Sequence, residues 1–196
     1  MKLCIFGGVG SGKSVALGYL KNKYGAEIIG MDETAHLLYE PGRKGFLAVK
    51  ELLGPSVVRE DGTLDRGKMA DLLYADKEKL AKLNSMIHPL VYAEVDRRME
   101  SSKAELTVVE TALPSAGRKS KYDEIWYVFT PAEIRRARLM QDRGYSSERV
   151  DEIMAKQPAD DTYTALADWV LENSGTPEDL MRRIDERLER KVKKVL

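Results

Sequence analysis

A glycine-rich segment near the N-terminus carries the clearest chemical signal in the chain. Residues 7–14 read Gly-Gly-Val-Gly-Ser-Gly-Lys-Ser, and they stand between an apolar run at 3–6 and a helical pattern at 15–20. Between a strand and a helix, this spacing predicts a loop that binds nucleotide phosphates. Glycines let successive backbone N–H groups point inward around a phosphate, and the helix that follows adds the positive end of its dipole.

Single positions of this loop have separate expected roles. Lys13 is placed to reach the β- and γ-phosphates of a nucleoside triphosphate, and the Ser14 hydroxyl is placed to ligate Mg²⁺. We expect the nucleotide to contact the whole run Gly8, Val9, Gly10, Ser11, Gly12, Lys13, Ser14 and Val15.

Short apolar runs separated by helical patterns predict the scaffold of this loop. The expected strands lie at 2–6, 26–29, 106–110, 124–129 and 168–172. Parallel strands joined by helices form a doubly wound sheet with right-handed crossovers. The expected fold class is therefore α/β, a P-loop nucleoside-triphosphate hydrolase fold whose five-stranded parallel sheet has helices on both faces.

Asp32 directly follows the second predicted strand. Ligands of doubly wound sheets bind beyond the carboxyl ends of the strands, so this carboxylate is expected beside the phosphate loop. There it could accept the proton of an attacking hydroxyl group. The alternative is a structural Asp that caps a helix at 33–39, and position alone favours neither.

Residues 33–100 lack strand signals and predict a helical insertion that holds the acceptor substrate. A helix is expected to end or kink at Pro89, so that His88 faces substrate, with simple packing as the alternative. Arg66 follows a turn and could meet an anionic group, although an exposed arginine is the commoner case.

The segment after the fourth strand predicts a lid. Residues 130–133 read Thr-Pro-Ala-Glu, which predicts a capping box at the start of a helix. That helix carries Arg135, Arg136, Arg138 and Arg143. Arginines beside a phosphate loop can neutralise charge on a transferring phosphoryl group, although surface pairs with glutamates are the alternative. With a turn at Gly144, we expect residues 135–157 to close over the site and exclude water.

Composition excludes several classes of function. The chain has 196 residues, a net charge of zero and 33% charged residues, so bulk charge favours neither a nucleic acid nor a membrane as partner. No apolar run reaches the roughly 18 residues of a membrane span, and no secretory pattern is present. The single cysteine, Cys4, is expected to be buried and unreactive. The expected location is the cytoplasm.

Further motifs follow the loop in a fixed order. They stand at 31–36, 40–42, 61–66, 87–90, 110–113, 123–128, 138–139, 143–146, 153–157 and 168–175. Together they resemble the dephospho-CoA kinase family along nearly the whole chain. The resemblance implies an adenylate-kinase-like core (1–32, 101–134 and 158–196), a CoA-binding insertion (33–100) and a mobile lid (135–157). It also implies a monomer that uses ATP and Mg²⁺ to phosphorylate the 3′-hydroxyl of dephospho-CoA, the last step of CoA biosynthesis.

The resemblance assigns roles by position. Asp32 matches the proposed base, and Lys13 and Arg138 complete the expected catalytic set. Arg143 matches a second lid arginine, and Asn173 lies in the loop that passes the adenine of ATP. Arg66 and His88 match the acceptor side, where they join Asp32 as expected substrate-binding residues.

The sequence also departs from the family pattern. Phe6 and Val15 replace hydroxyl residues common around the loop, and Gly30 replaces the first carboxylate of a usual Asp-Ala-Asp. Residues 114–117 replace a run that contacts the acceptor. Two rival functions therefore stay open: a kinase of another small alcohol or nucleotide, and a nucleotide binder without catalysis.

Overall fold

The computed structural model describes residues 1–195 of the chain and the side chains of residues 1–190. These residues form two compact units. The first comprises Met1–Ile28 and Lys103–Leu196, and the second comprises Ile29–Ser102. Each unit is described by itself below.

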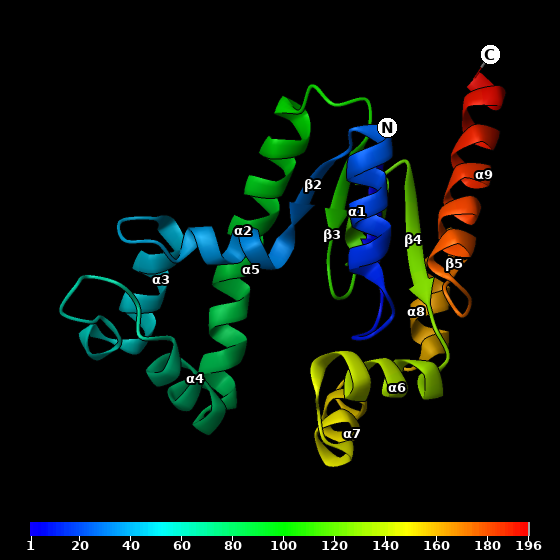
Figure 1. Ribbon diagram of the computed structural model, residues 1–196. Helices are drawn as coiled ribbons and strands as arrows, with labels where there is room; N and C mark the ends of the chain where they lie inside the picture. The colour runs from blue at the N-terminus through cyan, green and yellow to red at the C-terminus, as the bar shows by residue number, and fades with distance from the viewer. Residues whose placement is uncertain (196) are drawn as a thin grey trace. The chain divides into compact units, whose positions relative to one another are not determined.

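A five-stranded parallel sheet is the centre of the fold and confirms the predicted fold class (Figure 1). Its strands are β1 (Lys2–Phe6), β2 (Glu27–Gly30), β3 (Thr107–Glu110), β4 (Glu124–Phe129) and β5 (Trp169–Glu172). Their order is β2-β3-β1-β4-β5, so β1 is central and Ile5 lies opposite Glu110 on one side and Trp126 on the other. The central position explains why β1 reads as a continuous apolar run, since a strand covered on both faces has no solvent side.

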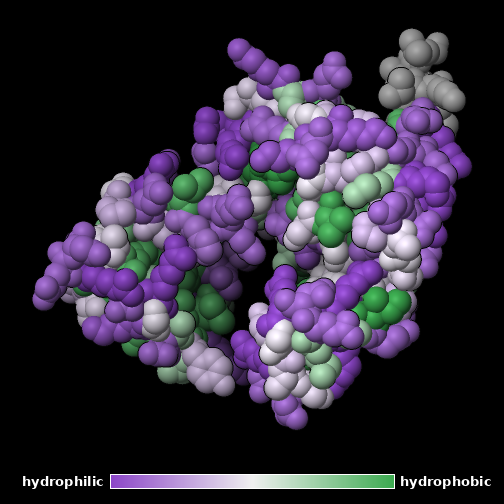
Figure 2. Space-filling view, in the orientation of Figure 1, coloured by the Kyte–Doolittle hydropathy of each residue, from purple (hydrophilic) through white to green (hydrophobic). Residues whose placement is uncertain are grey.

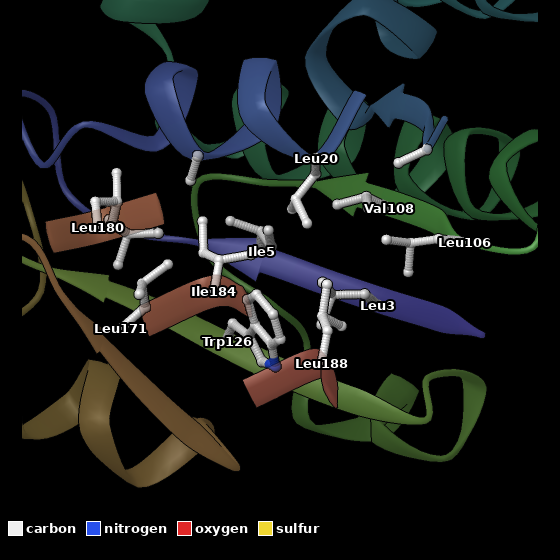
Figure 3. Close-up of a cluster of buried hydrophobic side chains, with 13 residues drawn as sticks. Leu3, Ile5, Leu20, Leu106, Val108, Trp126, Leu171, Leu180, Ile184 and Leu188 are labelled. Carbon is white, nitrogen blue, oxygen red and sulfur yellow. The ribbon is translucent and has the colours of Figure 1, made fainter. Parts of the chain in front are cut away.

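Helices cover both faces of the sheet in the first unit. Helices α1 (Lys13–Tyr24) and α9 (Pro177–Val195) cover one face, and α8 (Asp160–Leu166) covers the other. The unit also contains α6 (Ala132–Arg143) and α7 (Ser147–Ala155), which pack on each other, and a short 3₁₀ helix, η2, at Ala116–Lys121. Figure 3 shows one face, where Leu20 of α1 and Ile184 of α9 pack on Ile5 and Trp126. On the opposite face, Tyr163 of α8 packs against neighbouring aromatic rings of β1 and β4.

Cys4 lies in the core beneath α8 and is fully buried, as the sequence predicted. Burial raises the pKa of its thiol to about 12, and the nearby Glu110 carboxylate adds to the rise. The thiol therefore stays protonated at neutral pH, which makes it a poor nucleophile.

The second unit is helical, as predicted. It contains α2 (Met31–Leu38), α3 (Lys44–Leu53), η1 (Pro55–Val57), α4 (Arg66–Ala75) and α5 (Lys77–Ser101). The helix does not end at Pro89, because α5 runs through it, and the alternative of a kink there stays a prediction. Its buried side chains, Leu83, Ile87, Val91, Val95 and Met99, recur every four residues across the proline. This continuous apolar stripe offsets the hydrogen bond that proline cannot donate.

The visible surfaces of both units are mainly hydrophilic, with small separate apolar patches (Figure 2). Among the described residues, no helix has both the length and the apolar character that a membrane span requires.

Candidate active site

The loop between β1 and α1 has a backbone that requires glycine. Gly10 and Gly12 have φ angles of +80° and +87°, in the left-handed region that side chains rarely adopt. The Gly8 carbonyl accepts a hydrogen bond from the Ser11 N–H at 3.2 Å, and the Gly12 carbonyl accepts from the Val15 N–H at 3.0 Å, where α1 begins. The loop therefore ends in the N-terminus of a twelve-residue helix, whose first N–H groups have no partner within the helix.

A cavity of about 500 Å³ lies over this loop, within the first unit. It is lined by Gly8, Val9, Gly10, Ser11, Gly12, Lys13, Ser14, Val15, Arg138, Asp142, Arg143, Asn173, Gly175 and Pro177. The structure thus brings together every predicted residue of the nucleotide site. Asp142, Gly175 and Pro177 were not predicted, although each lies within a few residues of one that was.

Cations dominate the charged lining of the cavity. Lys13, Arg138 and Arg143 line it with one carboxylate, that of Asp142. The Lys13 ammonium donates a hydrogen bond to the Gly7 carbonyl at 2.7 Å and lies 3.4 Å from the Gly8 carbonyl. It is therefore held over the loop, where its charge and that of the two arginines favour an anionic ligand.

The loop is fixed to the ends of β4 and β5 through the Ser11 carbonyl. That oxygen accepts hydrogen bonds from the Asn173 side-chain amide at 2.8 Å and from the Thr130 hydroxyl at 3.0 Å. Arg138 donates to the Asn173 carbonyl at 3.0 Å. Both Thr130 and Asn173 are buried, so these bonds are protected from water.

The capping box predicted at Thr130 is wrong. The residue before α6 is Pro131, and no side chain caps this helix. The Thr130 hydroxyl instead contacts the carbonyls of Ser11 and Asn173, whose burial leaves few other donors for them.

The predicted arginines of α6 divide into distinct roles. Arg138 and Arg143 line the cavity, whereas Arg136 bonds to Asp151 and Ser147 of α7. Arg136 therefore forms a surface ion pair, although its partner is Asp151 of the next helix and not the expected glutamate. Gly144, with φ +64°, ends α6 and turns the chain toward α7, as predicted.

We expect Gly12→Ala to weaken binding of a nucleoside triphosphate by about tenfold or more, because each 1.4 kcal/mol of strain or displacement costs a factor of ten. The new Cβ would overlap the Asn173 amide, and its backbone would be strained at φ +87°. Isothermal titration measures the affinity. Gly18→Ala is the matched control, since open space surrounds Gly18 within α1. The control should keep the affinity and raise stability by roughly 0.5–1 kcal/mol. Unchanged affinity in Gly12→Ala would contradict the expectation.

Asp32, Arg66 and His88 lie in the second unit. Asp32 is exposed in the first turn of α2, and Gly30 holds the capping position, so the alternative that Asp32 caps this helix is wrong. Arg66 is the exposed first residue of α4. Burial raises the pKa of Tyr39, and the positive charge of the Arg66 guanidinium opposes that rise. His88 is exposed, and its ring lies 6.1 Å from that of Tyr92.

No cluster of three or more His, Cys, Asp or Glu side chains suited to a metal ion occurs in the part of the chain that the structure describes. The Ser14 hydroxyl nevertheless lines the cavity in the first turn of α1. A metal ion held there would take most of its ligands from a bound phosphate and from water, which is how Mg²⁺ binds beside nucleotides.

Known proteins resemble this chain over nearly its full length. Residues 1–179 match the family described as dephospho-CoA kinase. The dephospho-CoA kinase of Thermosynechococcus vestitus is 34% identical over 187 residues, which cover 95% of this chain and 92% of that protein. The crystal structure of TT1252 from Thermus thermophilus has a TM-score of 0.80 at 30% identity and covers 97% of each chain. Shikimate kinase from Acinetobacter baumannii, with a TM-score of 0.56 at 15% identity, covers 97% of this chain and 93% of its own and shares the fold.

Proposed function

The chain belongs to the dephospho-CoA kinase family, and from this premise we propose which of its residues bind the substrates and transfer the phosphoryl group. It is a kinase that uses ATP to phosphorylate dephospho-CoA. One observation supports the location of the ATP site above all others. The glycine loop, Lys13, Arg138 and Arg143 line one cavity whose charged groups are mainly cationic.

In this proposal the triphosphate of ATP lies along the loop between residues 7 and 15. The N–H groups of the loop and of the first turn of α1 donate to phosphate oxygens, as they do at helix N-termini generally. The Lys13 ammonium exchanges its contact with the Gly7 carbonyl for the β- and γ-phosphates. Arg138 and Arg143 neutralise charge that develops on the transferring phosphoryl group. Asn173 lies in the loop that passes the adenine, and its side-chain amide holds the phosphate loop through the Ser11 carbonyl.

The residues present fit a Mg²⁺ ion brought in with ATP. An exposed Ser14 hydroxyl in a phosphate-binding cavity, without a cage of carboxylates among the described residues, suits an ion that keeps several waters and phosphate oxygens as ligands. When bound, the ion neutralises phosphate charge. Ser14 would orient it through the hydroxyl oxygen.

We assign the acceptor side to residues of the second unit. The Asp32 carboxylate accepts the proton of the ribose 3′-hydroxyl as that oxygen attacks phosphorus. Arg66 and His88 contact the acceptor, for which their exposure leaves them available. The α6–α7 segment, residues 135–157, excludes water when it closes, so that ATP is not hydrolysed.

The decisive assay is ATP consumption by the purified protein with Mg²⁺, with and without dephospho-CoA, followed by mass spectrometry of the product. Consumption that depends on the acceptor and yields CoA is the expected result. A panel of nucleoside monophosphates and small alcohols tests the rival acceptors. Bound ATP without any product would contradict the assigned catalytic roles.

We further propose that the protein acts as a monomer in the cytoplasm. On the face that Figure 2 shows, the apolar patches are separate and surrounded by hydrophilic residues, which supports a monomer. Light scattering at assay concentration tests it, and a mass twice that of the 22.1 kDa chain would contradict it.

A further inference from the structure

Arg135 is a buried arginine directly beneath the phosphate loop. Its side chain is 8% exposed, although the arginines that follow it on α6 are more accessible. A Cβ added at Gly8 would overlap Arg135 Nη1, so the guanidinium occupies the space where a side chain at Gly8 would stand. The main chain of Arg135 is also close, since a Cβ at Gly10 would lie 3.1 Å from its carbonyl oxygen.

The partners of this guanidinium only partly satisfy it. Nη1 donates to the Gln157 side-chain carbonyl at 2.9 Å, and Nη2 lies 3.8 Å from an Asp160 carboxylate oxygen. The same Asp160 oxygen accepts a bond of 2.7 Å from the Tyr127 hydroxyl. Arg135 Nε is buried and has no hydrogen-bond partner. A charge buried with so distant a counter-ion is costly, and this cost indicates a role beyond packing.

We propose that Arg135 is a positioning residue of the phosphate loop, which holds Gly8 from behind and supplies a permanent buried positive charge to bound phosphates. The proposal rests on the ATP site assigned above. Arg135 does not line the cavity, so it acts through the loop and not by touching the nucleotide. Arginine stays protonated at every physiological pH, and a charge acts more strongly where water is excluded.

The two side-chain partners of Arg135, Gln157 and Asp160, link it to the proposed lid and to the helix that follows. Gln157 follows α7, and Asp160 begins α8. Arg135 therefore contacts the first half of the phosphate loop at Gly8, the end of the proposed lid at Gln157 and the start of α8 at Asp160. A change at Arg135 should consequently affect the placement of phosphates more than the placement of the nucleoside.

The test is Arg135→Met, which removes the charge and keeps an unbranched apolar stem. We expect affinity for ATP to fall about tenfold, that for ADP to fall less and that for AMP to change less than about twofold, because an electrostatic contribution scales with ligand charge. Isothermal titration gives the three affinities. Arg182→Met is the matched control, since it removes one cation from exposed pairs with Asp179 and Glu186 on α9, outside the proposed lid. The control should keep all three affinities.

Two results would overturn the proposal. One is an unchanged ATP affinity in Arg135→Met, and the other is an equal loss for ATP, ADP and AMP, which a packing role alone would produce. If Arg135→Met does not fold, Arg135→Lys decides, because it keeps the charge without the planar guanidinium. The ratio of AMP to ATP dissociation constants should stay within about threefold of the parent value, and a tenfold lower ratio would contradict the charge role.

Lys13→Ala separates this inference from the site assignment. If Lys13→Ala lowers ATP affinity and Arg135→Met does not, only the inference about Arg135 fails. If neither change affects ATP affinity, the assigned ATP site fails as well.

Discussion

Lys13→Ala is expected to lower kcat/KM for ATP by about 10²–10³-fold, the usual cost of removing a group that stabilises charge in a transition state. The ammonium is held over the loop by the Gly7 carbonyl at 2.7 Å, close to where we propose that phosphates bind. Alanine removes the ammonium group and the long side chain that carries it. Water that enters the space has no net charge and is not held in a fixed position. Initial rates of acceptor-dependent ATP consumption measure the effect.

The fall is expected in kcat as well as in ATP affinity, since the charge on the phosphoryl oxygens changes as the reaction proceeds. Lys21→Ala is the matched control: it removes an exposed lysine from the last turn of the same helix. Losing a cation there costs about 0.3–1 kcal/mol of stability and should leave the rate unchanged. Turnover by Lys13→Ala close to that of the parent protein would refute the assignment of the phosphate loop.

The sheet and the glycine loop are predictable from sequence because their signals are local. A strand such as β1 is buried on both faces, so its residues read as an uninterrupted apolar run. Gly10 and Gly12 adopt backbone angles that other residues avoid, so the glycine spacing itself encodes the turn.

A local sequence pattern gives a wrong prediction where a residue distant in the chain offers a competing hydrogen bond. Two segments carry the spacing of a capping box, at Thr130 and at Thr176. At Thr176 it forms: the side chains of Thr176 and Asp179 each accept a hydrogen bond from the other residue's backbone N–H, at 3.2 and 3.3 Å. Thr130 has the Ser11 carbonyl within reach, 119 residues away in the chain, and bonds to it instead. No window of sequence contains that carbonyl.

Helix boundaries are also hard to predict from local sequence, because packing against distant residues helps to set them. Pro89 is a strong local signal for an end, but the apolar stripe of α5 outweighs it. Helix α8 was not predicted from the sequence. Only one of its seven residues, Tyr163, is buried, so the sequence shows no helical spacing of apolar residues there. Tyr163 packs against the rings of Phe6 and Tyr127, which lie far from it in the sequence, so no local pattern indicates this contact.

In the candidate site, too, some residue roles follow from the sequence and others only from long-range contacts. The sequence has four arginines in the helix after β4, and only Arg138 and Arg143 had assigned roles, which came from the family resemblance. Burial separates Arg135 from the others, and the bond to Asp151 separates Arg136 from Arg138 and Arg143. Arg135 and Arg138 are three residues apart and Asp142 is four further on, which places them along one side of α6. That spacing was the available signal for Asp142.

Asp32→Asn is expected to lower kcat by about 10²–10⁴-fold, the range typical of a lost general base, and to leave the KM for ATP within about twofold. Asparagine has nearly the same shape but cannot accept a proton from the attacking hydroxyl. Asp32 is exposed in the first turn of α2 and does not cap the helix, so the fold should tolerate the change. Steady-state kinetics with both substrates varied measures kcat and each KM.

Glu33→Gln is the control that separates a specific role of Asp32 from the general loss of a carboxylate at the start of α2. Glu33 is the next residue, is also exposed and also places a carboxylate in the first turn of α2. Each change therefore removes the same favourable charge from the helix N-terminus, worth about 0.3–1 kcal/mol. If both variants lose turnover equally, the loss reflects that shared charge. If Asp32→Asn weakens ATP binding while kcat persists, Asp32 acts on the nucleotide or its metal. A fall in kcat confined to Asp32→Asn is the result that the role of Asp32 as the base predicts, because both changes remove a carboxylate from the same turn of α2.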